Sequence, residues 1–255
     1  MPRQTWRLLV TPPADGAQNM ALDEALMDRA RRTGEWVLRV YSWSRPTISL
    51  GRNQSARGRY DLTRVHELGL GVVRRPTGGR AILHDREITY SVTAPVRDAG
   101  DLRESYERIN RLLLSALHSI GVSASVAAPA TRSVTPGMAP CFDEPAAGEL
   151  TLAGRKLAGS AQWRSDDALL QHGSILLADD QTLLATLALD GPGEIPAPAT
   201  LSDALGSTPD VSIVGGALAE AVRNLEDANA RELAIDDELR ARASALVVRY
   251  VDDAW

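Results

Sequence analysis

The chain has 255 residues, of which 44% are hydrophobic and 24% are charged, as in an ordinary globular protein with one large domain. Its net charge of −5 argues against general nucleic-acid binding, and its single cysteine excludes an intramolecular disulfide framework and fits a reducing compartment. The sequence contains no apolar run long enough for a signal peptide or a membrane span. We therefore expect a cytoplasmic protein that binds neither nucleic acid nor membrane.

The hydrophobic pattern predicts strands in clusters, separated by helices. In the first half, strands are expected at 7–10, 36–43, 47–50, 70–75, 81–83 and 88–94, and helices at 19–32 and 102–120. In the second half, a loop is expected at 122–140, a hairpin at 149–161, a strand at 169–177, and helices at 182–189, 216–225 and 236–248. This order favours an α+β fold with a mixed, largely antiparallel sheet flanked by helices.

The domain organisation predicted from the length is a single domain over residues 1–255. Its core is expected at about 1–190, and a Gly/Pro-rich linker at 190–199 leads to a helical C-terminal part at about 200–255.

Two residues that each occur once give the first indication of chemistry. The chain has 27 arginines and one lysine, Lys156, which follows the only cysteine, Cys141, by fifteen residues. Lysine carries a compact ammonium on a slim stem, whereas arginine carries a wide planar guanidinium. A neighbouring cation lowers the pKa of a thiol, and the thiolate is the nucleophile. The pair indicates covalent acyl chemistry, although a buried thiol and a solvated surface amine are equally compatible with the two residues.

A second cluster runs through Arg74-Arg75-Pro76-Thr77-Gly78-Gly79-Arg80-Ala81-Ile82-Leu83-His84-Asp85. Consecutive glycines let a ligand approach the backbone, and their amides can form an anion-binding concavity, although such a pair between strands is often only a hairpin turn. His84 beside Asp85 fits either an oriented general base or a structural histidine. Eight arginines and three acidic residues lie between Arg52 and Arg86, a basic strip that can attract phosphate or an acidic partner.

Three runs together resemble a known family. They are Arg-Arg-x-Thr-Gly-Gly-Arg-Ala-x-x-His-Asp at 74–85, Gly-x-Lys-x-x-Gly-Ser-Ala-Gln at 154–162 and Gln-His-Gly-Ser at 171–174. In order and spacing they resemble the lipoate–protein ligase and octanoyltransferase superfamily, which includes the biotin ligases. The Thr-Gly-Gly-Arg form and Cys141-Phe142 ahead of the lysine resemble the octanoyltransferases of the Bacillus type, which acylate the H protein of the glycine cleavage system. The resemblance implies the class II synthetase-like fold of these catalytic domains.

The resemblance also implies residue roles. Cys141 is expected to be the acyl-thioester nucleophile, and Lys156 the group that lowers its pKa and holds the carbonyl. Substrate-binding residues are expected at Arg74, Arg75, Thr77, Gly78, Gly79, Arg80, Ala81, His84, Asp85, Gly159, Ser160, Ala161 and His172. No metal ligand is expected.

The hypothesis that follows is a two-step octanoyl transfer without a cofactor. Octanoyl-acyl carrier protein would acylate Cys141, and a lysine of a lipoyl domain or of the glycine cleavage H protein would then take the acyl group. Backbone amides near Gly78-Gly79 or Gly159-Ser160 are candidate oxyanion donors.

Three alternatives remain open from the sequence. An ATP- and Mg-dependent lipoate ligase would use Gly78-Gly79 and Arg75 on phosphates and Lys156 on the carboxylate, with Cys141 as a bystander. An amidotransferase would use the same cysteine to move octanoyl between lipoyl domains. An acyl-binding protein without catalysis is disfavoured by the presence of both Cys141 and Lys156.

Overall fold

The computed structural model describes residues 4–127, 148–165, 167–190 and 197–251. An eight-stranded sheet forms the centre, in the order β11-β1-β2-β6-β10-β9-β8-β7. Its strands are β1 (Trp6–Val10), β2 (Trp36–Tyr41), β6 (Glu87–Pro95), β7 (Ser125–Val126), β8 (Leu150–Leu152), β9 (Arg155–Ser165), β10 (Ala168–Leu176) and β11 (Arg231–Glu232). Strand β1 is parallel to both β2 and β11, and the remaining neighbours are antiparallel. The predicted α+β class with a mixed, largely antiparallel sheet is confirmed.

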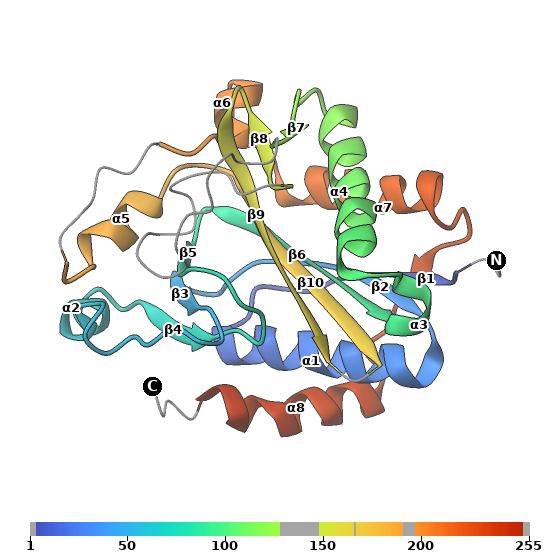
Figure 1. The fold of residues 1–255 in the computed structure, drawn as a ribbon, viewed down its shortest axis with the longest axis horizontal. Coiled ribbons are helices and arrows are strands. Elements are labelled where there is room, and N and C mark those ends of the chain that lie inside the picture. The colour runs from blue at the N-terminus through green and yellow to red at the C-terminus, as the bar shows by residue number, and fades with distance from the viewer. Residues whose placement is uncertain (1–3, 128–147, 166, 191–196, 252–255) are drawn as a thin grey trace.

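Two pairs of helices cover the two faces of this sheet (Figure 1). On one face α1 (Gly16–Thr33) packs against α8 (Asp237–Val251), and on the other α4 (Leu102–Ser119) packs against α7 (Val211–Leu225). Apolar side chains of α4 and α7 form the main core together with the strands, and those of α1 and α8 form a second core on the opposite face. The C-terminal helices therefore pack on both sides of the sheet. The single-domain organisation stays a prediction.

Helix α1 begins earlier than its apolar stripe indicates, because a capping box sets its start. The Asp15 carboxylate accepts a hydrogen bond from the Gln18 N–H, and the Gln18 side chain accepts one from the Asp15 N–H. Gly34, with a φ of 74°, ends the helix in the left-handed conformation. This cap fixes the register of α1, which carries Asn19, Met20 and Asp23 toward the sheet, where all three are buried.

A separate three-stranded sheet has the order β4-β3-β5. Its strands are β3 (Thr47–Leu50), β4 (Gly71–Arg74) and β5 (Ile82–His84). The sequence predicts a turn between two strands at 76–79, but β4 and β5 are not neighbours, because β3 pairs with both. The segment instead crosses the end of β3, where the Arg75 N–H donates to the Leu50 carbonyl and the Arg52 N–H donates to the Thr77 carbonyl.

Five short elements were not predicted. They are α2 (Leu62–Glu67), α3 (Val96–Ala99), α6 (Leu201–Leu205), β7 and β11, whereas α5 (Gln181–Thr186) falls within the helix predicted at 182–189 but for its first residue. Such elements contain too few residues to show a period of 2 or 3.6. In the described parts of the chain, no helix combines the length and the apolarity needed to cross a bilayer.

Candidate functional site

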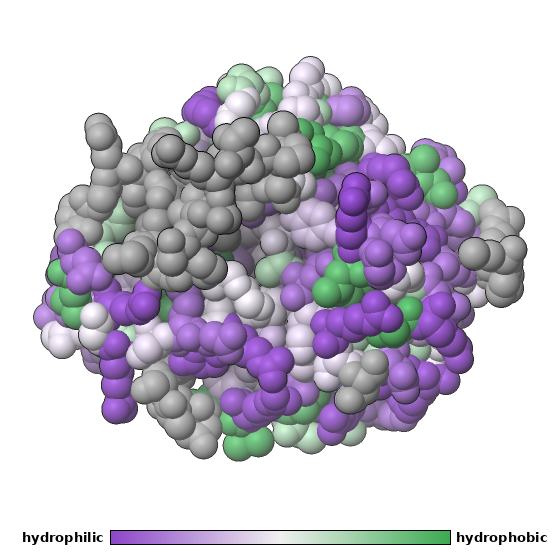
Figure 2. Space-filling model, in the orientation of Figure 1, coloured by the Kyte–Doolittle hydropathy of each residue, from purple (hydrophilic) through white to green (hydrophobic). Residues whose placement is uncertain are grey.

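A cavity of about 280 Å³ lies between the small sheet and strands β9 and β10 of the large sheet. The face drawn in Figure 2 is hollowed near its centre, with strongly hydrophilic residues along the lower edge of the hollow. The small sheet and the turn after β4 contribute Ser49, Arg75, Gly79, Arg80, Ile82 and His84 to the lining. The large sheet and α1 contribute Met20, Tyr41, Thr89, Lys156, Gly159, Ser160, Ala161, His172, Gly173 and Ser174, and Trp43 and Glu149 complete it.

Most of the residues expected at a site share this cavity. Nine of them line it: Arg75, Gly79, Arg80, His84, Lys156, Gly159, Ser160, Ala161 and His172. Thr77 is buried behind the wall, Ala81 belongs to the core of the small sheet, and Gly78 and Asp85 are exposed. Arg74 donates to the carbonyls of Gly51 and Gln54 and so holds the loop after β3. Cys141 lies outside the described residues, so its position beside Lys156 stays a prediction.

Lys156 reaches the cavity from the start of β9, with its side chain only 2% exposed. Its Nζ lies 2.6 Å from Glu149 Oε1, and the Glu149 side chain is itself only 8% exposed. A buried ammonium needs such a partner, because an isolated charge in a protein interior costs several kcal/mol. The sequence indicated Lys156 through its rarity but missed Glu149, which the β8–β9 hairpin folds back onto it.

Arg75 organises the turn that forms one wall of the cavity. Its guanidinium donates to the Ser49 carbonyl (2.9 Å), the Gly78 carbonyl (2.8 Å), the Arg80 carbonyl (2.7 Å) and the Thr77 hydroxyl (3.2 Å). An arginine has five N–H donors in a fixed fork, and these acceptors use its Nε and both terminal nitrogens. In this structure Arg75 is therefore engaged by the protein and sets the conformation of residues 78–80.

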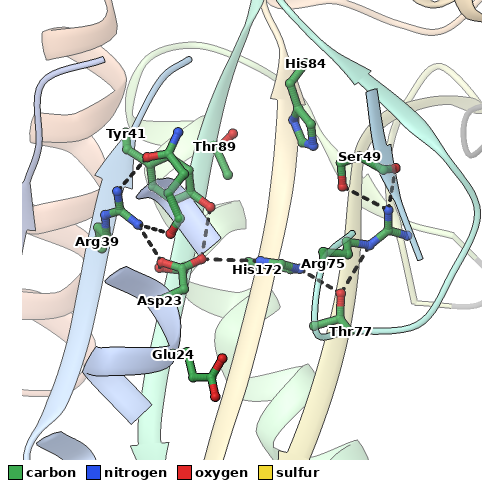
Figure 3. A network of polar contacts seen from close by, with 12 residues as sticks. Asp23, Glu24, Arg39, Tyr41, Ser49, Arg75, Thr77, His84, Thr89 and His172 are labelled. Carbon is green, nitrogen blue, oxygen red and sulfur yellow. Dashed lines mark hydrogen bonds and ion pairs between the residues drawn. The ribbon is translucent and has the colours of Figure 1, made fainter. Parts of the chain in front are cut away.

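A buried network connects α1 to this turn (Figure 3). Asp23 Oδ1 lies 2.7 Å from Arg39 NH1, and both side chains are buried completely or nearly so. The other oxygen, Oδ2, lies 3.4 Å from His172 Nδ1, and His172 Nε2 lies 2.7 Å from the Thr77 hydroxyl. Neither Asp23 nor Arg39 was predicted as a site residue. Their only signal in the sequence is that each is a charged residue among apolar ones, Asp23 on the stripe of a helix and Arg39 in a strand.

The charges of this network shift two pKa values. Burial raises the pKa of Asp23, but the Arg39 charge and the contact with His172 outweigh it and leave that pKa below its ordinary value. Burial lowers the pKa of His172, and the Asp23 carboxylate offsets this only in part. At neutral pH we therefore expect Asp23 to be ionised and His172 to be neutral.

His84, the other histidine of the cavity, pairs with Glu87 and not with Asp85, its neighbour in the sequence. The His84 ring stacks on Trp43 with centroids 4.1 Å apart, and its Nδ1 lies 3.1 Å from Glu87 Oε1. Asp85 is exposed instead. The Trp43 indole donates to the Thr89 hydroxyl at 2.8 Å, and that hydroxyl donates to the same Glu87. Two residues further along a strand return to the same face, which is why Glu87 and Thr89 act together.

Lowering the pH below about 6.5 is expected to reduce the free energy of unfolding through His172. Its pKa in the folded protein lies below its ordinary value of 6.5, so the unfolded chain takes up the proton first and stability is lost as the pH falls. Asp180 acts in the opposite direction, because burial raises its pKa to about 6 and the folded state binds its proton first.

Urea denaturation of the wild type and of His172→Gln at about pH 7 and about pH 5 separates the two effects, since Asp180 is present in both proteins. The wild type should lose more stability than the variant between these pH values. An equal loss in both proteins would contradict the expected contribution of His172.

Comparisons with known proteins identify the family of the chain. The sequence profile of the lipoyl protein ligase A/B catalytic domain matches residues 15–241. A protein named octanoyltransferase LipM from Kyrpidia tusciae is 39% identical over 99% of this chain and 98% of its own length. Proteins of the same name from Bacillus subtilis (40% identical; 74% of this chain, 71% of the relative) and Carboxydothermus hydrogenoformans (44%; 69% and 66%) also match.

Solved structures share the fold. The crystal structure of lipoate-protein ligase A bound with ATP superposes with a TM-score of 0.78 at 21% identity, covering 96% of this chain and 95% of that one. A bi-partite lipoate protein ligase from Thermoplasma acidophilum gives 0.77 at 21% identity, covering 96% and 93%. These structures confirm the predicted fold class. The octanoyltransferase relatives confirm the predicted class of enzyme, an acyltransferase of protein lipoylation. The chain belongs to the lipoyl protein ligase A/B catalytic domain family.

Proposed function

We propose that this chain transfers an octanoyl group from acyl carrier protein to a lysine of a lipoyl domain, such as the glycine cleavage H protein, through a thioester on Cys141. The relatives named octanoyltransferase, one of them matched over nearly the whole chain, support this activity. The observation that carries the proposal is the buried ammonium of Lys156 in the wall of a cavity. An ammonium in that position can stabilise both a thiolate and the developing negative charge of an attacked carbonyl.

In the first step, the Cys141 thiolate attacks the carbonyl carbon of the carrier thioester, a new C–S bond forms, the bond to the carrier sulfur breaks, and the carrier leaves as a thiolate. In the second step, the neutral amine of the target lysine attacks the acyl-cysteine, an amide forms, and the bond to the Cys141 sulfur breaks to release its thiolate. The proton that the amine loses balances the one that the carrier thiolate takes up from water. A free cysteine is only about 3% thiolate at pH 7, and a pKa lowered from about 8.5 to about 7 raises this to about half. Lys156 supplies the positive charge for that shift.

The state of Arg75 favours this reaction over ATP-dependent ligation. In a ligase, Arg75 and the glycines beside it would hold nucleotide phosphates. Here the Arg75 guanidinium already donates to Ser49, Gly78 and Arg80. An acyl thioester is already activated, so the proposed reaction needs no ATP and no metal ion. In the described residues, no group of three or more histidine, aspartate or glutamate side chains is arranged to hold a metal.

The basic strip is the proposed landing site for the acyl carrier. Five of its arginines have exposed side chains: Arg52, Arg57, Arg59, Arg64 and Arg86. Positive potential near a pocket attracts an acidic partner and speeds its association, an effect that salt screens. Because the cysteine must stay reduced to act as a nucleophile, we place the reaction in the cytoplasm.

The test is an intact-mass measurement of the protein after incubation with octanoyl-acyl carrier protein in the absence of ATP. The wild type should gain one octanoyl group that hydroxylamine removes, and Cys141→Ala should gain none. An unmodified wild type, together with pyrophosphate release on addition of ATP and lipoate, would assign the protein to the ligases instead. An adduct that persists in Cys141→Ala would overturn the role of the cysteine.

A further inference from the structure

The hydrogen-bond partners of His172 in the buried network determine which of its two ring nitrogens carries the proton. Asp23 is ionised and can only accept hydrogen bonds, so the Nδ1 of His172 that faces it must carry a proton. At the other end, the Arg75 Nε can only donate, and it does so to the Thr77 hydroxyl at 3.2 Å. The hydrogen of that hydroxyl is then available for His172 Nε2, 2.7 Å away. The hydrogen bonds therefore all point the same way: Arg75 donates to Thr77, Thr77 donates to His172 Nε2, and His172 Nδ1 donates to Asp23.

Asp23 is well suited to fix one end of this series. It lies on α1 outside the cavity lining and is completely buried. Its Oδ1 accepts from Arg39 (2.7 Å) and from the Ser91 hydroxyl (2.8 Å), and its Oδ2 accepts from the Tyr41 hydroxyl (3.0 Å). These contacts from β2 and β6 leave the carboxylate no freedom to rotate, so the direction in which it meets His172 is set by the fold.

We propose that Asp23 is a positioning residue of the cavity, which holds His172 with its proton on Nδ1 so that Nε2 accepts the Thr77 hydroxyl. Thr77 in turn keeps Arg75 on the carbonyls of Gly78 and Arg80, so that α1 sets the shape of one wall of the cavity that Lys156 also lines. The positioning itself follows from the contacts, and its consequence for turnover rests on the proposed function. The charged or titratable groups around His172 are Asp23 from α1, Arg75 after β4 and His84 from β5, and the last two lower the pKa of His172 and so favour the neutral ring.

The tautomer can be measured directly in the intact protein. The chain has four histidines, so a two-bond proton–nitrogen correlation spectrum of protein labelled with ¹⁵N-histidine shows four imidazoles, and the one lost in His172→Gln is assigned to His172. At neutral pH the wild type should show a protonated Nδ1 and an unprotonated, hydrogen-bonded Nε2. A proton on Nε2 instead, or on both nitrogens, would overturn the proposal.

Asp23→Asn reverses the prediction. Arg39 can only donate hydrogen bonds, so the amide oxygen must face Arg39 and the amide NH₂ must face His172. His172 must then accept at Nδ1 and carry its proton on Nε2. We expect the tautomer to switch and the kcat of octanoyl transfer to fall about 100-fold, since small misplacements of a cavity wall have effects of this size. The matched control is Glu24→Gln, the same chemical change one residue along α1. No dashed line joins Glu24 to the network in Figure 3, and its carboxylate meets Arg249 and Tyr250 instead. The control should keep both the tautomer and the kcat.

A second variant serves if Asp23→Asn does not fold. Thr77→Val removes the hydroxyl but keeps the shape, so the proton should stay on Nδ1 while the Nε2 resonance moves to that of a nitrogen without a donor. An unchanged Nε2 resonance would contradict the Thr77 contact. The proposed function is judged separately, because the octanoyl adduct is measured by mass on the wild type, whereas the tautomer is measured by NMR without any substrate.

Discussion

Replacement of Lys156 by arginine is expected to reduce octanoyl transfer at least about 100-fold, although the charge is kept. The loss of one positioned donor to a developing oxyanion typically costs about 100-fold to 1,000-fold in kcat. Lys156 Nζ is buried and lies 2.6 Å from Glu149 Oε1. A planar guanidinium is wider than an ammonium and brings five donors, so it cannot occupy the same position without moving the cavity wall. The measurement is the rate of octanoyl transfer from carrier to lipoyl domain, with urea denaturation to confirm that the variant folds.

The matched control is Arg155→Lys, the neighbouring residue on β9. Adjacent residues of a strand point to opposite faces, and the Arg155 side chain is 45% exposed and lies 3.4 Å from Asp203. This variant should transfer octanoyl at the wild-type rate. Because Cys141 is the only cysteine, the pH dependence of its alkylation by iodoacetamide reports its pKa directly. A folded Lys156→Arg variant that transfers octanoyl within twofold of the wild type would refute the role proposed for the lysine.

The long elements of the fold were predictable because each contains enough residues to show its period. The alternation of Ile88, Tyr90, Val92 and Ala94 predicted β6, and the three-to-four spacing of apolar residues predicted α4, which is stopped by Gly121 with a φ of 88°. The order of strands in the sheets was not predictable in the same way. Strand β3 lies between β4 and β5, and this follows from which edges meet in space.

The candidate site was predictable where rarity or glycine marked it and was missed where burial defines it. Lys156 and the glycines of the turn were noticed as exceptions in the sequence. Asp23, Arg39 and Glu149 were not, since charged side chains are usually solvated. Burial of a charged residue is a property of the packed molecule, and each of these three is buried against a partner of opposite charge.

The turn that forms one wall of the cavity is held by contacts with the backbone as well as by charged side chains. Arg75 ties the turn to β3 from one side, and the network of Asp23 and His172 ties it to α1 from the other. A substitution that separates the turn from β3 should therefore damage both stability and the shape of the cavity, even without touching a polar group.

Gly51→Ala is the substitution that does this, and we expect it to lower the free energy of unfolding by about 3 kcal/mol or more. A Cβ built on Gly51 would lie 2.0 Å from the Gly79 carbonyl oxygen and 3.2 Å from the Gly78 carbonyl carbon. Both are backbone atoms, so no side-chain rotation relieves the clash, and overpacking of this kind costs typically about 1–3 kcal/mol or more. The hydrogen bond from the Arg52 N–H to the Thr77 carbonyl, 2.8 Å long, spans the same junction and should break.

Gly78→Ala provides the comparison within the same turn. A Cβ at Gly78 meets nothing within 4 Å, and its φ lies outside the left-handed region. Urea denaturation should show Gly78→Ala within about 0.5 kcal/mol of the wild type, as for an ordinary surface substitution. Equal stabilities of the two variants would mean that the turn does not pack against β3 as described. A destabilised Gly51→Ala that still transfers octanoyl at the wild-type rate would mean that the cavity keeps its shape without this contact.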